Sequence, residues 1–337
     1  MSWETRSDTG LAIIGQVNDA LKIADKWRVD EPRGFMWWAS DFAQRIWADP
    51  GIFHHTHSVY RLHAEIELIR GRGHAAEHEV FLSHLMSRAT LSALVHDPQG
   101  DTYKLHCSVY ACDDNADWLG RLFLSAVGIQ ISEAHCTARK LSDDLKSAAA
   151  TTSHPNSGIR NEPDPMCTAL ERFFKPAGAN PSRWEDVPEW EEADQNIKRL
   201  AQKRSGDGKS FLHAEFAWAG DPTHGDCAIL EVTTQRPHPE LGNGLHLCLI
   251  LPLRMDEENA AHTALELNAA ERREWKWIHD LGSWCCENEQ VEFNCFVPNT
   301  SYNKAILPNL VHEMAIRANW ASELAQAEAR SSGAHLA

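Results

Sequence analysis

Leu62-His63-Ala64-Glu65 is a short stretch that returns unchanged as Leu212-His213-Ala214-Glu215 later in the chain. Both copies lie in segments where apolar and polar residues alternate, which is the pattern of a strand with one buried face. The repeated stretch predicts two similar halves that each carry this strand.

A second pair of stretches follows the first in each half. Leu105-His106-Cys107 precedes Asp113-Asp114-Asn115-Ala116, and Leu245-His246-Leu247 precedes Glu257-Glu258-Asn259-Ala260. In both places a strand pattern is followed by acidic residues, which favour the N-terminal end of a helix because its dipole is positive there. The order of these stretches strengthens the prediction that one strand-and-helix unit occurs twice.

The composition is that of an acidic globular protein with room for two cores. The chain has 337 residues, of which 43% are hydrophobic, and a net charge of −16. A chain of this length usually divides into two domains. The negative charge repels phosphate backbones, so nucleic acid is excluded as the expected partner. The same charge fits either a well-solvated surface or a site for a basic partner segment.

The cysteines and the apolar segments predict a cytoplasmic location. The nine cysteines are odd in number and irregularly spaced, which indicates reduced thiols rather than a disulfide framework. The chain opens with polar residues, and no run approaches the roughly 18 apolar residues that cross a bilayer. We therefore expect neither a signal peptide nor a membrane partner.

The first part of the chain is predicted to hold an extension and a domain. A helix at residues 13–27 forms an N-terminal helical extension (1–34), and a Trp-rich amphipathic helix at 35–47 opens the first domain (35–147). The other predicted elements of this domain are strands at 60–68, 91–95 and 103–109 and a helix that begins after Asp113 and Asp114. Residues 71–84 read as an insertion.

The second part is the cleaner copy. Residues 148–184 are rich in Pro, Gly and Ser and form a connector. The second domain (185–328) is predicted to run in the order helix, three strands, helix, two strands, helix. Its elements are an acidic segment at 185–194 that leads into a helix reaching 203, strands at 212–218, 227–234 and 245–251, a helix at 257–274 with Asp256 as N-cap, strands at 278–286 and 291–297, and a helix at 306–325. Residues 329–337 form a flexible tail.

These elements predict an α+β protein of two tandem domains, each a mainly antiparallel sheet packed with helices. The order of elements resembles the type III secretion chaperone-like superfamily, which includes the YbjN-type regulators. The resemblance rests on residues 185–328 and, in part, on residues 35–147, which lack a counterpart to the last two strands. It implies a non-enzymatic protein that dimerises and holds polypeptides along apolar grooves.

A polar face carries the histidines of the repeated stretches. His63 and Glu65 project from one face of their strand, as do His213 and Glu215, and the third strand of each half adds His106 and His246. In a simple meander these strands lie about 9.6 Å apart, twice the usual strand spacing. Direct pairing across that gap is not expected. The cluster therefore reads either as an inherited polar surface or, alternatively, as a site for a metal or for acid–base chemistry.

Tryptophans supply the candidate partner-binding surface. Thirteen are present, and burial in a core is their default role. The alternative is a partly exposed aromatic groove for a peptide, because Trp is enriched at binding hot spots. The candidate residues are Trp37, Trp38, Trp47, Trp218, Trp275, Trp277 and Trp284.

Two motifs resemble a phosphate-binding loop and a zinc site, but neither has the residues that such a site needs. Residues 203–210 end in Gly-Lys-Ser, but a phosphate-binding loop needs a glycine where Lys203 stands and must lead from a strand into a helix. His54, His55 and His57 lack further ligands at a familiar zinc spacing. No residue pattern predicts a catalytic residue, a cofactor or a metal ion.

The sequence therefore favours a protein-interaction, chaperone-like or regulatory module that binds a polypeptide, with the acidic surface selecting basic segments. One alternative is an enzyme, metal-dependent or acid–base, that uses the repeated His/Glu face. Another is a structural subunit whose duplicated domains assemble into a larger homo-oligomer.

Overall fold

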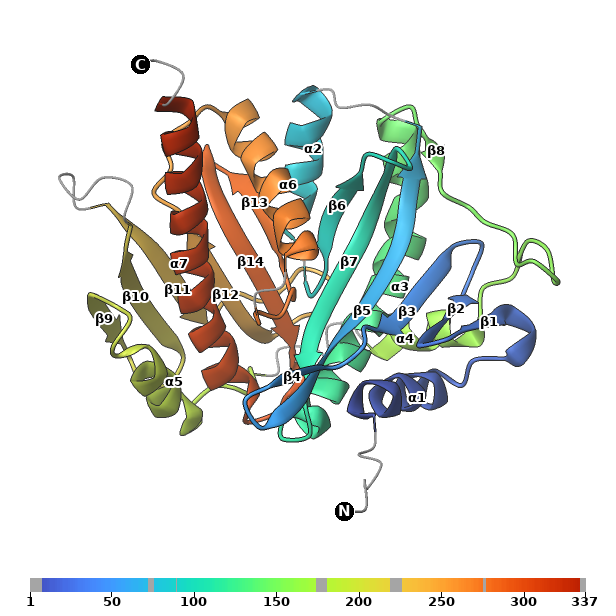
Figure 1. The fold of residues 1–337 in the computed structure, drawn as a ribbon, viewed down its shortest axis with the longest axis horizontal. Coiled ribbons are helices and arrows are strands. Elements are labelled where there is room, and N and C mark those ends of the chain that lie inside the picture. Colours follow the sequence, from blue (N-terminus) through green and yellow to red (C-terminus); the bar gives the residue numbers. More distant parts are fainter. Residues whose placement is uncertain are drawn as a thin grey trace. The chain divides into compact units, whose positions relative to one another are not determined.

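The structure is a computed structural model that describes residues 8–71, 76–88, 90–173, 181–218, 226–274 and 277–333 (Figure 1). Its described residues form helices and two antiparallel sheets, which confirms the predicted α+β class. The contacts divide the chain into two compact units. Unit 1 comprises Met1–His74, Leu91–Phe174 and His279–Leu281, and unit 2 comprises Ala75–Thr90, Lys175–Ile278 and Gly282–Ala337.

Unit 1 is a sheet in the order β1-β2-β3-β5-β7-β6, with β4 and β8 each paired to β5. The central strand β5 buries Leu62, Ala64 and Ile66 on the face that α1 and α3 cover. The strands are β1 (Arg28–Glu31), β2 (Gly34–Trp38), β3 (Ala43–Ala48), β4 (Ile52–His54), β5 (His57–Arg70), β6 (Ala93–Asp97), β7 (Thr102–Ala111) and β8 (Ala148–Ala149). The helices are α1 (Thr9–Leu21), α3 (Ala116–Asp144) and α4 (Pro165–Phe173).

Unit 2 is a sheet in the order β13-β14-β12-β11-β10-β9, and α6 and α7 pack on it. Its core includes a buried network in which Glu271 of α6 accepts hydrogen bonds from Trp284 and Arg317. The strands are β9 (Lys203–Gly206), β10 (Phe211–Ala217), β11 (Cys227–Thr233), β12 (Gly244–Ile250), β13 (Ser283–Glu287) and β14 (Gln290–Pro298). The helices are α2 (Ala76–Met86), α5 (Glu189–Ile197), α6 (Glu257–Arg273) and α7 (Ile306–Gly333).

The two sheets share one connectivity. Apart from β4 and β8, which pair with β5 off the main path, the strands of each sheet follow one order along the chain: four strands, a helix, two more strands and a long helix. The intervening helix is α2, which belongs to unit 2, for the first sheet and α6 for the second, and the sixth strand of each path lies between the fourth and the fifth. Ala64 pairs with Cys107 across β5 and β7, and Leu247 pairs with Cys295 across β12 and β14. We align the two sheets by matching the first pair to the second. By this alignment β5 corresponds to β12 and β7 to β14.

The repeated tetrapeptide does not follow this correspondence. Residues 62–65 lie on β5, whereas residues 212–215 lie on β10, which corresponds to β2. The pairing of residues 105–107 with residues 245–247 fails in the same way, because they lie on β7 and β12. The predicted alignment of the halves is therefore wrong, because apolar-His-apolar-acid stretches satisfy the alternation of any half-buried strand.

Other elements also differ from expectation. Residues 35–47 form the hairpin of β2 and β3 rather than a helix, since burial alternates along both strands and aromatic residues favour such strands. The segment read as an insertion holds α2. The helix expected to reach residue 203 ends at Ile197, and Lys203 begins the additional strand β9. Asp256 does cap α6, because its side chain accepts a hydrogen bond from Asn259 N.

The division into units also differs from the predicted domain boundaries. The helix α1 and the strand β1 belong to unit 1 rather than to a separate extension. Residues 75–90 of the first half belong to unit 2, and residues 279–281 of the second half belong to unit 1. The predicted tail is partly helical, because α7 reaches Gly333, and residues 334–337 lie outside the described residues.

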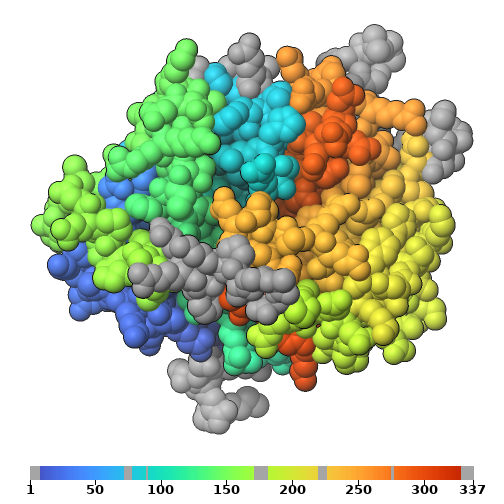
Figure 2. Space-filling view, turned by 180° about the vertical axis from the view of Figure 1, so that it is seen from behind, coloured from blue at the N-terminus to red at the C-terminus, as the bar shows by residue number. Residues whose placement is uncertain are grey.

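Each exchanged segment adds a backbone contact to the last strand of its unit. In unit 1, Ser108 and Asp280 exchange two backbone hydrogen bonds of 3.2 and 2.8 Å. In unit 2, Phe296 N donates to Thr90 O at 3.1 Å. Ser108 and Phe296 occupy corresponding positions by register. The helix α2 also packs on α6 and β13, and its cyan surface lies beside the orange surface of β13 in Figure 2.

Candidate functional site

The polar face of the unit 1 sheet brings predicted site residues together. Its central strand β5 presents Arg61, His63 and Glu65 on the face opposite Leu62 and Ala64. We expected the strands that carry His63 and His106 to lie two spacings apart. Instead β5 pairs directly with β7, because β7 lies between β5 and the edge strand β6. Glu65 is thus the direct cross-strand partner of His106.

Three residues form a continuous hydrogen-bonded chain, here called the histidine chain: Asp49, His63 and His106. His63 Nε2 lies 3.0 Å from Asp49 Oδ2, and His63 Nδ1 lies 3.2 Å from His106 Nε2. An ionised carboxylate only accepts hydrogen bonds, so His63 carries its proton on Nε2. In a neutral ring Nδ1 then accepts, which makes His106 Nε2 the donor. Donors therefore run from His106 through His63 to Asp49.

The surroundings of the histidine chain hold it in place and affect its protonation. Trp47 stacks on His63 with ring centroids 4.6 Å apart and planes 7° from parallel, and Arg45 lies over Trp47 at 4.6 Å. His63 and His106 are buried, whereas the Asp49 side chain is 38% exposed. The chain thus joins a buried imidazole to a carboxylate that solvent reaches.

The pKa values of Asp49 and His63 both lie below their ordinary values. Burial lowers the pKa of His63 below its ordinary value, and the hydrogen bond to Asp49 offsets only part of that effect. Burial raises the pKa of Asp49, but the hydrogen bond from His63 and the nearby Arg61 charge outweigh it and hold the pKa low. At neutral pH the pair is therefore a neutral imidazole that donates to an ionised carboxylate.

A buried ion pair lies next to the histidine chain on the same strand. Arg61 contacts Asp280 at 2.8 Å, and both side chains are less than one-tenth exposed. Ser108 Oγ accepts from Arg61 Nε at 3.0 Å and donates to Asp280 Oδ2 at 2.8 Å. The Ser108 proton is thus directed to a carboxylate that an arginine already neutralises, which suits a structural hydroxyl rather than a nucleophile.

The corresponding predicted residues in unit 2 are not brought together. His213 and Glu215 form a contact of 3.5 Å along β10, and Lys203 pairs with Glu215 at 2.8 Å. His246 lies on β12, with β11 between it and β10, as a meander predicts. Burial lowers the pKa of His246 to about 4, although a hydrogen bond with Asn294 opposes the shift.

Sulfur and amide groups occupy the equivalent face of unit 2. We call Cys248, Cys285, Glu292 and Asn294 the sulfur row. Cys248 Sγ donates to Glu292 Oε2 at 3.4 Å, and Asn294 Nδ2 donates to Cys285 Sγ at 3.2 Å. Burial raises the pKa of both thiols and of the Glu292 carboxyl. Both cysteines therefore remain protonated and are poor nucleophiles.

Most of the candidate tryptophans lie in the cores. Trp37, Trp38 and Trp284 are at most 3% exposed and Trp218 is 7% exposed, so these rings offer almost no surface to a partner. Trp47 is half-buried beneath His63, Trp277 is 37% exposed, and Trp275 lies outside the described residues. The described tryptophans do not form an open aromatic groove.

A hairpin that sequence reasoning read only as a histidine cluster carries Phe53, the most exposed large apolar side chain among the described residues. We call residues 52–57 the arm. Phe53 is 67% exposed and Ile52 is 45% exposed, and both lie on β4, whose only strand partner among the described residues is β5. His57 contacts Asp114 at 3.4 Å. The adjacent apolar residues Ile52 and Phe53 before the histidines were the available sequence signal.

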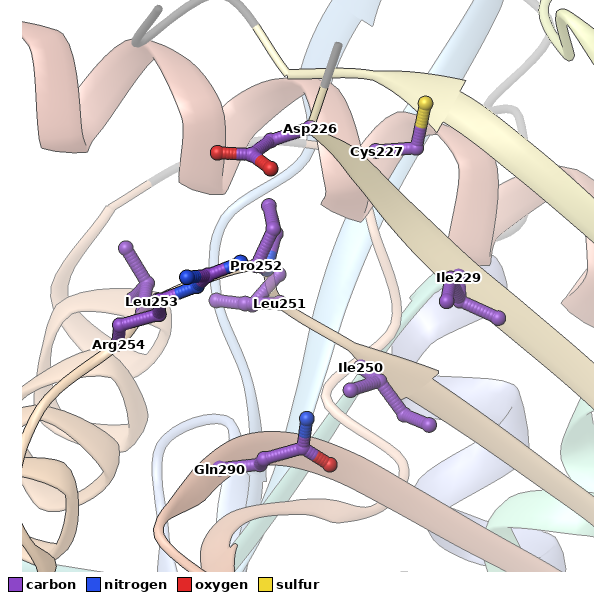
Figure 3. A pocket seen from close by; sticks show the side chains of 9 residues that line it. All are labelled: Asp226, Cys227, Ile229, Ile250, Leu251, Pro252, Leu253, Arg254 and Gln290. Atoms are coloured by element: carbon purple, nitrogen blue, oxygen red, sulfur yellow. The ribbon is translucent and has the colours of Figure 1, made fainter. Parts of the chain in front are cut away.

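Unit 2 contains a pocket of about 200 Å³ (Figure 3). Ile229 and Ile250, which are direct cross-strand partners, lie on one side of it, and Asp226 and Arg254 lie on the other. The remaining lining residues are Cys227, Leu251, Pro252, Leu253 and Gln290. Sequence reasoning missed this site, because it gathers the ends of three strands that are distant in the chain.

Among the described residues, no group of three or more His, Cys, Asp or Glu side chains is placed to hold a metal ion. No helix in the described ranges is long and apolar enough to cross a membrane. Comparison of the chain with protein-family models, with curated proteins and with solved structures finds no match.

Proposed function

We propose that the protein is a non-enzymatic interaction module, chaperone-like or regulatory, that binds a polypeptide partner through the arm. The observation that carries this proposal is the exposure of Phe53 and Ile52 on adjacent positions of β4. Large apolar side chains on an edge strand attract other chains, and proteins usually protect such edges. An extended segment that pairs with β4 would gain main-chain hydrogen bonds and cover both side chains.

The charge of the chain narrows the chemistry of the partner. A net charge of −16 favours association with a basic segment, because complementary charge accelerates encounter and excludes acidic competitors. We therefore expect a partner strand that alternates apolar and basic residues. Such a strand would cover Phe53 and place its cations near Asp114.

The shared connectivity of the two units supports the same proposal. It is the order of the superfamily resemblance, with one more strand in each unit, and we attribute it to an ancient duplication of one gene segment. A duplicated unit of that kind would correspond to a chaperone-like dimer fused in one chain. The nine cysteines are all free, which supports a reducing compartment such as the cytoplasm.

The test is co-purification from the native source with the full chain as bait, followed by mass spectrometry. A partner that wild type retains and that F53S together with I52S loses supports the proposal. F81S is the matched control, because Phe81 is 40% exposed on α2 of unit 2. Loss of the partner with the control alone, or its retention by the arm variant, would refute the assignment to the arm.

A second candidate function is acid–base catalysis by the histidine chain, and one observation favours it. His63 lies 3.0 Å from Asp49 and 3.2 Å from His106, which forms a relay along which a proton could pass between a buried imidazole and a carboxylate that solvent reaches. Hydrolysis of a panel of ester, amide and phosphate probes by wild type, H63Q and H213Q tests it. Activity that H63Q loses and H213Q keeps supports an enzyme, and equal rates in all three exclude it.

A third candidate is a structural subunit of a homo-oligomer. Exposed apolar residues of the arm would then meet a second copy. Light scattering distinguishes this case, because F53S would convert a larger wild-type species into a smaller one without any foreign partner.

A further inference from the structure

We infer that the unit 2 pocket binds a free α-amino acid with a branched aliphatic side chain. This inference is independent of the arm and of its partner. It rests on the size of the pocket, its apolar side and two charged groups that have no partner among the described residues.

The size limits the occupant to a small molecule. The pocket measures about 200 Å³, below the range of about 300–1,000 Å³ that suits drug-sized ligands. Ile229, Ile250 and Leu251 supply an apolar surface, and Pro252 and Leu253 extend it. Branched aliphatic groups match this lining, since burying each methylene contributes about 0.8 kcal/mol.

The charges define the head group of the ligand. Asp226 and Arg254 lie on the same side of the pocket (Figure 3). Neither side chain makes an ion pair or hydrogen bond within the described part of the chain, and the same is true of Gln290. Opposite charges that line one pocket without pairing can both be satisfied by a zwitterion: the ammonium faces Asp226, and the carboxylate faces Arg254.

This chemistry separates a free amino acid from the end of a polypeptide. A C-terminal residue offers a carboxylate but no α-ammonium, and an N-terminal residue offers the reverse. Only a free amino acid carries both charges next to one side chain. Arg254 is exposed and Asp226 is partly exposed, so the site can be entered from solvent.

The test uses isothermal titration calorimetry of the full chain with L-leucine, N-acetyl-L-leucine and L-leucinamide. We expect saturable leucine binding that weakens about tenfold in each analogue, because each lacks one charge. R254Q should weaken leucine about tenfold and leave leucinamide unchanged. D226N should weaken leucine similarly and leave N-acetyl-leucine unchanged.

Two controls keep the inference falsifiable. R236Q replaces an exposed arginine of unit 2 outside the pocket and should bind leucine like wild type, and circular dichroism checks the fold of each variant. Absence of saturable leucine binding overturns the inference. N-acetyl-leucine or leucinamide binding as tightly as leucine also overturns it and would assign the pocket to a chain terminus.

Discussion

The polar faces of the two sheets use corresponding strand positions but carry different chemical groups. In unit 1 the positions hold His63, Glu65 and His106, and in unit 2 the corresponding positions hold His246, Cys248 and Asn294. The first set is an ionic and proton-sharing network, whereas the second belongs to a row of thiol, amide and carboxyl groups in which burial raises the pKa values of the thiols and of the carboxyl. One framework therefore accommodates either kind of buried polar cluster.

The largest effect on the free energy of unfolding should come from the buried Arg61–Asp280 ion pair. Unit 2 has no ion pair at the corresponding described strand positions. D280N removes the carboxylate that Arg61 contacts at 2.8 Å in a buried site, and we expect the free energy of unfolding to fall by about 3–5 kcal/mol. Chemical denaturation measures it. The double variant R61M/D280L should recover part of the loss, since it removes both charges. A loss below about 1 kcal/mol in D280N would show that the pair is not desolvated.

The next effect is a dependence of stability on pH, which should be larger for His246 of unit 2 than for His63 of unit 1. The pKa of His246 is about 4 in the folded protein against 6.5 ordinarily, so the unfolded chain binds a proton first as the pH falls. Stability contributed by the neutral ring is complete above pH 6.5 and is lost progressively towards pH 4. The shift is equivalent to about 3 kcal/mol, and partial exposure of the ring reduces our expectation to about 2 kcal/mol.

Denaturation of wild type and H246N between pH 6.5 and pH 4 checks this prediction. H246N should flatten the loss of stability over that interval. H63N should flatten it less, because Asp49 offsets part of the burial effect on His63. Parallel pH profiles for wild type and H246N would contradict the assignment.

A smaller loss of stability is expected when a histidine of the histidine chain is replaced, and almost none when a surface histidine is replaced. H63Q removes the ring that joins Asp49 to His106, and we expect a loss of about 1–2 kcal/mol because a buried donor is left without its acceptor. H213Q should change stability by less than about 0.5 kcal/mol, because its contact with Glu215 is at the surface. Equal losses in the two variants would remove the distinction.

The smallest effect is expected in the sulfur row. E292Q keeps the shape of the Glu292 side chain and removes a carboxyl whose pKa burial raises, so it removes a charge that burial already disfavours. We expect a change within about 0.5 kcal/mol at neutral pH. Urea unfolding of E292Q and of D280N measures the loss in the free energy of unfolding for each carboxyl under the same conditions. A loss comparable to that of D280N would mean that Glu292 is ionised and paired.

The sequence predicts local elements better than their arrangement. Alternation predicted the strands β5 and β7, and the acidic residue before a helical segment predicted the cap Asp256, because both signals are carried by neighbouring residues. The helix expected at 35–47 failed because several tryptophans suit either period, and only tertiary burial selects one. The tetrapeptide repeat misled the alignment of the halves, since it reflects strand alternation rather than equivalent positions.

The candidate site was predicted in part for the same reason. The shared face of His63 and His106 follows from alternation, but their contact depends on strand order, which the sequence does not display. Asp49 was missed because it lies in the turn after β3. The contact of Asp280 with Arg61 was not predicted, because Asp280 belongs to the half of the chain that otherwise forms unit 2.

The exchange of residues 75–90 and 279–281 has a consequence for the inheritance of this gene. Each unit includes a segment that is encoded in the opposite half of the gene. A deletion of the first half would therefore remove α2 from unit 2, and a deletion of the second half would remove Asp280 from unit 1. Shortening to a single-unit protein would therefore require compensating changes, and selection should keep both halves together in one reading frame.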